Sequence, residues 1–265
     1  MIYITSSSNP TIKEIKSLYR RKERWAKESF IVEGIKIVEE CIDNNYPLRN
    51  IIISDELYNI RGGEGLLEKI IDNNSLIKVP DRLYKEISDM ENPQGVLAVA
   101  SFKRDSIKNI YDIDNPFILL LDQVQDPGNM GTIIRTADAF SVDGIIITEG
   151  CVDIYNPKVV RATMGSIFRV PIYHYSDGIE IIKELKNRNI KVYSTSLKGE
   201  KFIQNVNFNI PSILIIGNES KGVSKSLETL ADSLIKIPMI GDAESLNAAI
   251  ASSIIMYETI RQRSQ

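Results

Sequence analysis

Short apolar runs alternate with amphipathic stretches along most of the chain. In the first hundred residues, strand-like runs lie at 51–53, 76–79 and 96–100, and the apolar residues between them recur with helical spacing. A further helix is predicted over about 9–28, because this stretch opens on a Ser-Asn-Pro sequence that suits a helix start. The alternation indicates a small α/β domain in this part of the chain.

The second half of the chain repeats the alternation with more continuous apolar strands. The predicted strands lie at 117–121, 144–148, 170–172, 191–195, 213–216 and 234–237. Apolar strands separated by amphipathic helices indicate a parallel sheet that is covered on both faces. Ligands bind such sheets in the loops that follow the carboxyl ends of the strands. We therefore expect the chemistry of this domain to lie in those loops.

A polar stretch separates the two halves and predicts the domain boundaries. The sequence between 102 and 116 is rich in charged and polar residues. We predict a first domain over 1–105, a linker over 106–116 and a second domain over 117–265.

The composition argues against several classes of protein. Apolar residues make up 43% of the 265 residues and charged residues 25%, which is ordinary for a globular protein. No apolar run approaches the ~18 residues that a membrane-spanning helix needs, and no signal peptide is recognisable. Two isolated cysteines and one histidine offer neither a disulfide framework nor a metal cluster. We expect a cytoplasmic protein without a bound metal.

The net charge of −3 conceals an uneven distribution of basic residues. Five of them recur at spacings of three or four: Lys13, Lys16, Arg20, Arg24 and Lys27. This spacing puts them on one side of the predicted helix, where such a stripe is able to follow a phosphate backbone. A solvated helix face without a ligand is the alternative interpretation.

The first motif covers 122–140, directly after a predicted strand and at the start of a helix. Gly128 and Gly131 allow a tight turn and leave room for a ligand. Their spacing is not the G-x-G-x-x-G of a dinucleotide-binding loop, which argues against an NAD-dependent enzyme. Arg135 lies off the apolar face of the helix, and on pattern alone it is a surface residue paired with Asp138.

The second motif covers 213–224 and has glycines five apart after a strand, at Gly217 and Gly222. Val223 stands where a phosphate-binding P-loop needs its lysine, so a nucleotidase is not expected. A glycine-rich turn with Glu219 near a helix start is the purely structural interpretation.

The third motif covers 235–251, where a strand ends at a proline and a glycine turns the chain. Ser245 or Asn247 is expected to cap the helix that follows. One stripe of that helix is apolar and consists of Leu246, Ile250, Ile254 and Tyr257. Small residues between them suggest a close approach of the backbone to the sheet or to a second subunit.

Together and in this order, the three motifs resemble the SpoU/TrmH family of RNA 2′-O-ribose methyltransferases, a branch of the SPOUT superfamily. The patterns N-x-x-G-x-x-x-R-T, G-N-E and I-P-M-x-G-x-x-x-S-L-N carry the resemblance over roughly 117–260, and 156–166 is similar to a further family segment. The N-terminal region resembles the substrate-binding domain of members that act on 23S ribosomal RNA, which is similar to ribosomal protein L30e. The resemblance implies a parallel-sheet catalytic domain with a trefoil knot, which general topology rules disfavour, preceded by a smaller L30e-like α/β domain.

The resemblance also implies a cofactor, a set of site residues and a homodimer. It assigns catalytic roles to Asn129, Arg135, Glu219, Ser245 and Asn247. It assigns binding of S-adenosylmethionine to Thr195, Gly217, Ile237 and Leu246. We also predict RNA contacts for Arg161 and for the basic stripe. An arginine holds its proton far above neutral pH, so positioning and phosphate contact suit Arg135 better than literal proton abstraction.

Three functions are weighed on this basis. A 2′-O-methyltransferase that acts on 23S ribosomal RNA is favoured by the motifs and by the additional N-terminal domain. A transfer RNA methyltransferase of the same family is the first alternative, although those enzymes often carry short helical extensions instead of such a domain. A non-catalytic RNA-binding or ribosome-assembly factor is the second alternative.

Overall fold

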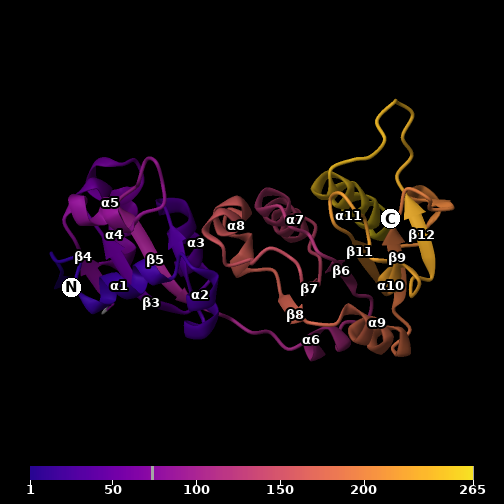
Figure 1. Cartoon of the computed structure of the whole chain (residues 1–265), viewed down its shortest axis with the longest axis horizontal. Helices are drawn as coiled ribbons and strands as arrows, with labels where there is room; N and C mark the ends of the chain where they lie inside the picture. Colours follow the sequence, from indigo (N-terminus) through magenta and orange to yellow (C-terminus); the bar gives the residue numbers. More distant parts are fainter. Residues whose placement is uncertain (73–74, 265) are drawn as a thin grey trace. The chain divides into compact units, whose positions relative to one another are not determined.

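The computed structural model describes residues 1–72 and 75–264, which form two compact units (Figure 1). The first unit contains Met1–Lys103 and Asp153–Phe168, and the second contains Arg104–Val152 and Arg169–Gln265. Residues 153–168, which the sequence analysis places in the second domain, therefore pack with the first unit.

The first unit is a mixed sheet with helices around it. The strand order is β1 (Ile2–Tyr3), β4 (Leu76–Lys78), β3 (Leu48–Ile53), β5 (Val96–Ser101) and β2 (Ser29–Glu33). β5 is antiparallel to both of its neighbours, and the other pairs are parallel. The helices are α1 (Pro10–Ser17), α2 (Arg21–Lys27), α3 (Ile35–Asp43), η1 (Asp55–Asn59), α4 (Gly63–Ile70), α5 (Asp81–Ile87), α8 (Pro157–Thr163) and η2 (Ser166–Phe168).

The prediction of one helix over 9–28 is wrong, because the helix is interrupted between α1 and α2. Arg20 caps α2 in an extended conformation, with φ −93° and ψ 130°. The guanidinium of Arg24 donates to the carbonyl oxygens of Leu18 and Tyr19 at 2.8 and 2.9 Å. It thereby satisfies carbonyl groups that the end of α1 leaves without helical partners.

The helix break also divides the predicted basic stripe between α1 and α2, so its members do not share one helix face. Arg24 is only 3% exposed and forms an ion pair with Asp153, with Nη2 and Oδ2 2.7 Å apart. The prediction that Arg24 belongs to an exposed RNA-binding stripe is therefore wrong. Lys13 and Arg20 are exposed.

Aromatic side chains hold residues 153–168 within the first unit. Tyr155 stacks on Phe102 with ring centroids 3.8 Å apart, and it packs against Phe30 at 4.7 Å. Trp25 makes edge contacts with Phe102 and Tyr155. Because aromatic pairs contribute about 0.5–1.5 kcal/mol each beyond their burial, this cluster accounts for the association of the segment with the first unit.

The second unit is built on a parallel sheet. Its strand order is β10 (Lys201–Phe202), β12 (Ser233–Lys236), β9 (Lys191–Thr195), β11 (Ser212–Ile216), β6 (Phe117–Leu121), β7 (Gly144–Thr148) and β8 (Ile172–Tyr175), with all neighbours parallel. The helices are α6 (Lys108–Tyr111), α7 (Pro127–Ala139), α9 (Gly178–Asn187), η3 (Ile203–Asn205), α10 (Lys225–Glu228) and α11 (Ala248–Arg263).

Helices cover both faces of this sheet, as the apolar strands predict. Ile118 and Leu120 of β6 belong to a buried cluster that includes residues of α6, α9 and α10. The neighbouring Phe117 points to the opposite face of the sheet. There the guanidinium of Arg263 in α11 lies over its ring, 5.6 Å from the ring centroid. α7 packs against α11 on that same face (Figure 1).

One predicted strand, over 170–172, is displaced toward the C-terminus. β8 begins at Ile172 because Pro171 has no N–H to donate to a ladder. The carbonyl of Pro171 still accepts from the backbone N–H of Ile145 at 2.9 Å, at the edge of the pairing with β7.

Replacing Asp153 with alanine should lower the free energy of unfolding of the first unit by about 3–5 kcal/mol, because it leaves the guanidinium of Arg24 buried without a carboxylate. Fluorescence of Trp25, the single tryptophan, reports the transition in urea. Asp89→Ala is the control, since Asp89 is about half exposed and 3.5 Å from Arg161, and a loss below ~1 kcal/mol is expected there. Equal losses in the two variants would contradict the assignment.

Candidate active site

The three motifs follow strands that lie close together in the sheet of the second unit. β6 is beside β11, β11 is beside β9, and β9 is beside β12. Because these strands are parallel, the loops that follow them emerge at one edge of the sheet. The segments 122–126, 217–224 and 237–247 therefore share the carboxyl edge.

α7 starts at this edge because its first residues carry strong start signals. Asp126 is the N-cap, and its Oδ1 accepts from the backbone N–H of Asn129 at 2.7 Å. Pro127 follows at the first helical position, where a missing N–H costs nothing. Met130 and Ile133 are buried, as the sequence predicts. Asn129 is also largely buried, with only 9% of the residue exposed.

Asn129 is the centre of a hydrogen-bonded chain that connects all three motifs. Its Nδ2 donates to Oε1 of Glu219 at 3.0 Å, and its Oδ1 accepts from Nδ2 of Asn247 at 2.8 Å. The Oδ1 of Asn247 accepts in turn from the backbone N–H groups of Ala249 and Ile250, at 2.9 and 3.2 Å. The chain runs from a carboxylate through two carboxamides to the start of α11.

These bonds set the orientation of both carboxamide groups. A carboxylate only accepts, so Asn129 presents its NH₂ to Glu219 and its oxygen to Asn247. The helix N–H groups only donate, so Asn247 presents its oxygen to α11 and its NH₂ to Asn129. A negative charge at one end and a helix start at the other therefore fix which polar atoms remain for a ligand.

Glu219 is ionised at neutral pH. Desolvation raises its pKa, but hydrogen bonds from the Asn129 side chain and from backbone N–H groups, including those of Asp126 and Gln125, hold the pKa below its ordinary value. The site therefore contains a permanent negative charge at neutral pH, because the hydrogen-bond partners of Glu219 favour its ionised form.

The turn that carries Glu219 requires a glycine at 217. Asn218 and Gly222 exchange backbone hydrogen bonds at 3.0 and 2.9 Å, so the chain folds back on itself. A Cβ on Gly217 would lie 2.1 Å from the backbone of Gly222 and Val223. Gly217, predicted as a cofactor-binding residue, thus also has a steric reason to be glycine.

Arg135, a predicted catalytic residue, lies outside the hydrogen-bonded chain. It is exposed on α7, six residues and roughly 9 Å along the helix axis from Asn129. It makes no hydrogen bond or ion pair with any residue that the structure describes. The alternative pairing with Asp138 is wrong, because Asp138 binds Arg169 at 2.7 Å.

The segment that leads into α11 confirms one of the two predicted helix caps. Asn247 is the helix cap, whereas Ser245 is exposed in the preceding loop and takes no part in the cap. Two residues of the apolar stripe are exposed, Ile250 at 53% and Tyr257 at 58%. The small residues Ala249 and Ser252 are buried together with Ile255 and Met256, and α11 packs against α7.

The predicted cofactor-binding residues lie at the same carboxyl edge. Thr195 ends β9, Ile237 follows β12, and Leu246 precedes α11, and each is half-buried. Residues 238–246 form a long, mostly exposed loop, visible between β12 and α11 in Figure 1. Within the described chain, their N–H and C=O groups make no bonds to other backbone groups.

Two polar residues that the sequence analysis did not select tie the first motif to the second. Asp122 is 3% exposed and accepts from the backbone N–H of Ser224 at 2.7 Å. Asn218 donates from Nδ2 to the carbonyl oxygen of Gln123 at 2.9 Å. An acidic residue directly after an apolar strand was an available signal for Asp122, whereas the contact of Asn218 depends on how the loops meet.

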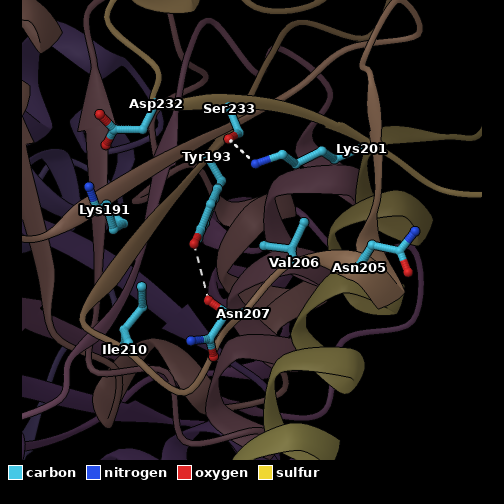
Figure 2. Close-up of a pocket in the computed structure, with 9 residues that line it drawn as sticks. All are labelled: Lys191, Tyr193, Lys201, Asn205, Val206, Asn207, Ile210, Asp232 and Ser233. Atoms are coloured by element: carbon cyan, nitrogen blue, oxygen red, sulfur yellow. Dashed lines mark hydrogen bonds between the residues drawn. The ribbon is translucent and has the colours of Figure 1, made fainter.

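A pocket of about 380 Å³ lies elsewhere in the second unit (Figure 2). Lys191, Tyr193 and Ser233 line it at the amino ends of β9 and β12, opposite to the carboxyl edge. The hydroxyl of Tyr193 donates to the carbonyl oxygen of Asn207, and Lys201 Nζ donates to Ser233 Oγ. The pocket contains no residue of the hydrogen-bonded chain, so it is distinct from the candidate active site.

Residues 1–72 and 75–264 contain no group of three or more His, Cys, Asp or Glu side chains placed to hold a metal ion. Over the same residues, no helix has both the length and the apolar character of a membrane span. Both cysteines are buried and free.

Comparison with known proteins defines the class of this chain. Residues 116–257, more than half of its length, match the model of the SpoU rRNA Methylase family, and the chain belongs to this family. Residues 9–98 match the model of the MRM3-like substrate binding domain.

Two relatives match over almost the whole chain. One is the 23S rRNA (guanosine(2553)-2′-O)-methyltransferase RlmP of Bacillus subtilis (strain 168), which is 31% identical over 97% of this chain and 98% of its own length. The other is the 23S rRNA (uridine(2479)-2′-O)-methyltransferase of Streptomyces viridochromogenes, which is 31% identical over 93% of this chain and 87% of its own length.

A solved structure agrees with the fold over both units. The AdoMet-bound rRNA methyltransferase from Sinorhizobium meliloti superposes with a TM-score of 0.86 at 31% identity, over 98% of this chain and 97% of its own. These findings confirm the predicted SpoU family and its α/β fold. The family match, the relatives and the AdoMet-bound structure together confirm the predicted class of enzyme, an S-adenosylmethionine-dependent RNA 2′-O-methyltransferase.

Asn129→Ala should raise the pKa of Glu219, because it removes the side-chain hydrogen bond that most lowers this pKa. The folded-state pKa lies below the ordinary value of 4.5, so the stabilisation from these bonds is present above pH 4.5 and is lost as the pH falls through the folded-state pKa. Carbon-13 NMR titration of the Glu219 carboxyl should show a midpoint below 4.5 that moves upward in the variant. Thr132→Ala, on the exposed side of α7, is the control. A wild-type midpoint above 4.5 would contradict the assignment.

Proposed function

We propose that this chain methylates a ribose 2′-hydroxyl of 23S ribosomal RNA with S-adenosylmethionine as the methyl donor. The observation that carries the proposal is the hydrogen-bonded chain from Glu219 through Asn129 to Asn247, which joins three loops at the carboxyl edge. Family membership and two relatives named for 23S rRNA support this RNA over transfer RNA. The match of residues 9–98 to a substrate binding domain supports a dedicated RNA-selecting unit.

The loops at the carboxyl edge suit S-adenosylmethionine by their chemistry. The free backbone N–H and C=O groups of 238–246 match the donors and acceptors on the edge of adenine. Ile237 and Leu246 offer apolar surface, and Thr195 a hydroxyl, at half-buried positions. When bound, the cofactor supplies a methyl group on a positively charged sulfonium, which a carboxylate at Glu219 favours electrostatically.

The residues of this chain have separate roles in that reaction. A ribose hydroxyl must lose its proton as it attacks. Asn129 donates one amide hydrogen to Glu219, and its second amide hydrogen binds and orients an oxygen of the RNA. Arg135 binds a phosphate and stabilises charge as it develops on the attacking oxygen. Asn247 holds Asn129 in register, and Ser245 lies in the adjacent loop.

The first unit selects the RNA in this proposal. Lys13 and Arg20 are exposed and are the first choice for phosphate contacts, although Arg20 lies 4.0 Å from the carboxylate of Glu23. Lys16, Lys27 and Arg161 each have a polar partner within the unit, so RNA must compete for them. A ribosomal substrate would place the protein in the cytoplasm. The trefoil knot stays a prediction.

A homodimer completes the proposed site. Arg135 does not reach Asn129 within one chain, and it is exposed without a partner in the described structure. The exposed apolar residues Ile250 and Tyr257 of α11 lie on the helix that packs against α7. We infer that a second copy covers this face of α11 and brings its Arg135 to the Asn129 of the first.

Arg135→Ala should reduce methyl transfer to 23S rRNA about 100-fold or more, far more than it weakens RNA binding, because it removes a group that acts on the developing charge. Transfer of labelled methyl groups from S-adenosylmethionine, with mapping of the modified ribose, measures this. Arg188→Ala is the control, since Arg188 stacks over Tyr111 on the opposite face. If the wild type binds the RNA but transfers no methyl group, the ribosome-assembly alternative replaces the proposal.

Mixing the inactive variants Arg135→Ala and Asn129→Ala should restore activity if Arg135 acts in the partner's site. Subunit exchange would give about a quarter of the wild-type rate, since half of the dimers are mixed and each of those has one complete site. The measurement is methyl transfer after co-refolding at equal concentrations. No recovery despite mixed dimers would place Arg135 and Asn129 in the same chain's site.

A further inference from the structure

We propose that Lys221 binds an RNA phosphate beside the target ribose and so positions the nucleotide over Asn129 and Glu219. The inference rests on the proposed function, because it names the chemical group of the RNA that the same site would hold. Neither the motif patterns nor the family resemblance selects Lys221 as a site residue; its position in the folded turn does.

Lys221 is held in the tight turn that also carries Glu219. The turn is closed by the paired backbone groups of Asn218 and Gly222. The Oδ1 of Asn218 also accepts from the backbone N–H groups of Ser220 and Lys221, at 3.0 and 3.1 Å. Because two residues span at most about 7 Å, the Lys221 backbone is fixed close to the backbone of Glu219.

The ammonium group of Lys221 is available to a ligand. The Lys221 side chain is exposed and makes no hydrogen bond or ion pair within the part of the chain that the structure describes. Other lysines of this region are engaged: Lys225 binds Glu228 at 3.0 Å, and Lys236 lies over the ring of Phe202 at 5.0 Å. Among the described residues, the ammonium of Lys221 therefore has no ion-pair partner that competes with a ligand.

The acidic residues of the site explain why a cation is needed in this turn. Glu219 accepts from the backbone N–H of Asp126 at 3.1 Å, so the two carboxylates share one edge. RNA brings one negative charge with each nucleotide, and these carboxylates repel it. An ammonium on the same turn offsets the repulsion where the backbone must approach Asn129, and a flexible point charge suits a phosphate.

Lys221→Ala should raise the KM for 23S rRNA transcribed in vitro about 3- to 10-fold, with kcat changed less than about two-fold, since a binding contact is lost and the reacting groups remain. The slope of log(kcat/KM) against log[KCl] should become shallower by about one unit. Lys221→Arg should restore both values. Lys225→Ala, four residues away and bound to Glu228, is the matched control and should behave as wild type.

Filter binding of the same transcript at two KCl concentrations gives a second readout that does not need turnover. An unchanged KM and salt slope in Lys221→Ala, with an active wild type, would overturn the phosphate contact. A loss of kcat at constant KM would also overturn it, because it would show that Lys221 only supports the turn. If the wild type itself transfers no methyl group, the proposed function fails, and the salt dependence of binding still decides the role of Lys221.

Discussion

The hydrogen bond between the Asn129 carboxamide and the Glu219 carboxylate is the contact on which the arrangement of the site depends. It joins the loop after β6 to the loop after β11, and it determines which atoms Asn129 presents to Asn247. Asn247 in turn accepts from the backbone N–H of Ala249 at the start of α11, so every bond donates in the direction of Glu219. Because Glu219 only accepts and the N–H groups at the start of α11 only donate, a single orientation of both carboxamides satisfies every bond, and the polar atoms facing a substrate are unique.

The parallel sheet makes this contact possible. Residues 90 and 118 positions away from Asn129 in sequence reach it because the strands before them end at one edge. Packing in the first unit is of a different kind. The buried ion pair of Arg24 with Asp153 and the stacking of Tyr155 on Phe102 hold a segment of the region that matches the SpoU family model within the first unit. The division of the chain into units therefore does not follow the linear order of its motifs.

The errors of sequence reasoning have a common origin. The spacing of Arg24 is that of an exposed stripe, yet its guanidinium is buried where it meets two carbonyl groups and a carboxylate. Ile250 and Tyr257 share an apolar stripe on α11, yet they are exposed, whereas Ala249, Ser252, Ile255 and Met256 are buried. In both cases a tertiary partner overrides the local pattern, since burial depends on what packs opposite and not on spacing alone.

The sequence by itself determined the alternation of strands and helices, the parallel character of the second sheet and the family, because apolar periodicity and motif order are local properties of the chain. It also identified Asn129, Glu219 and Asn247 as candidates through their motifs. Only the tertiary structure decided that these three bond to one another, that Arg135 stands apart from them, and that Lys221 is held beside Glu219. The physical reason is that hydrogen bonding and burial are set by distances across the fold, which no spacing along the chain records.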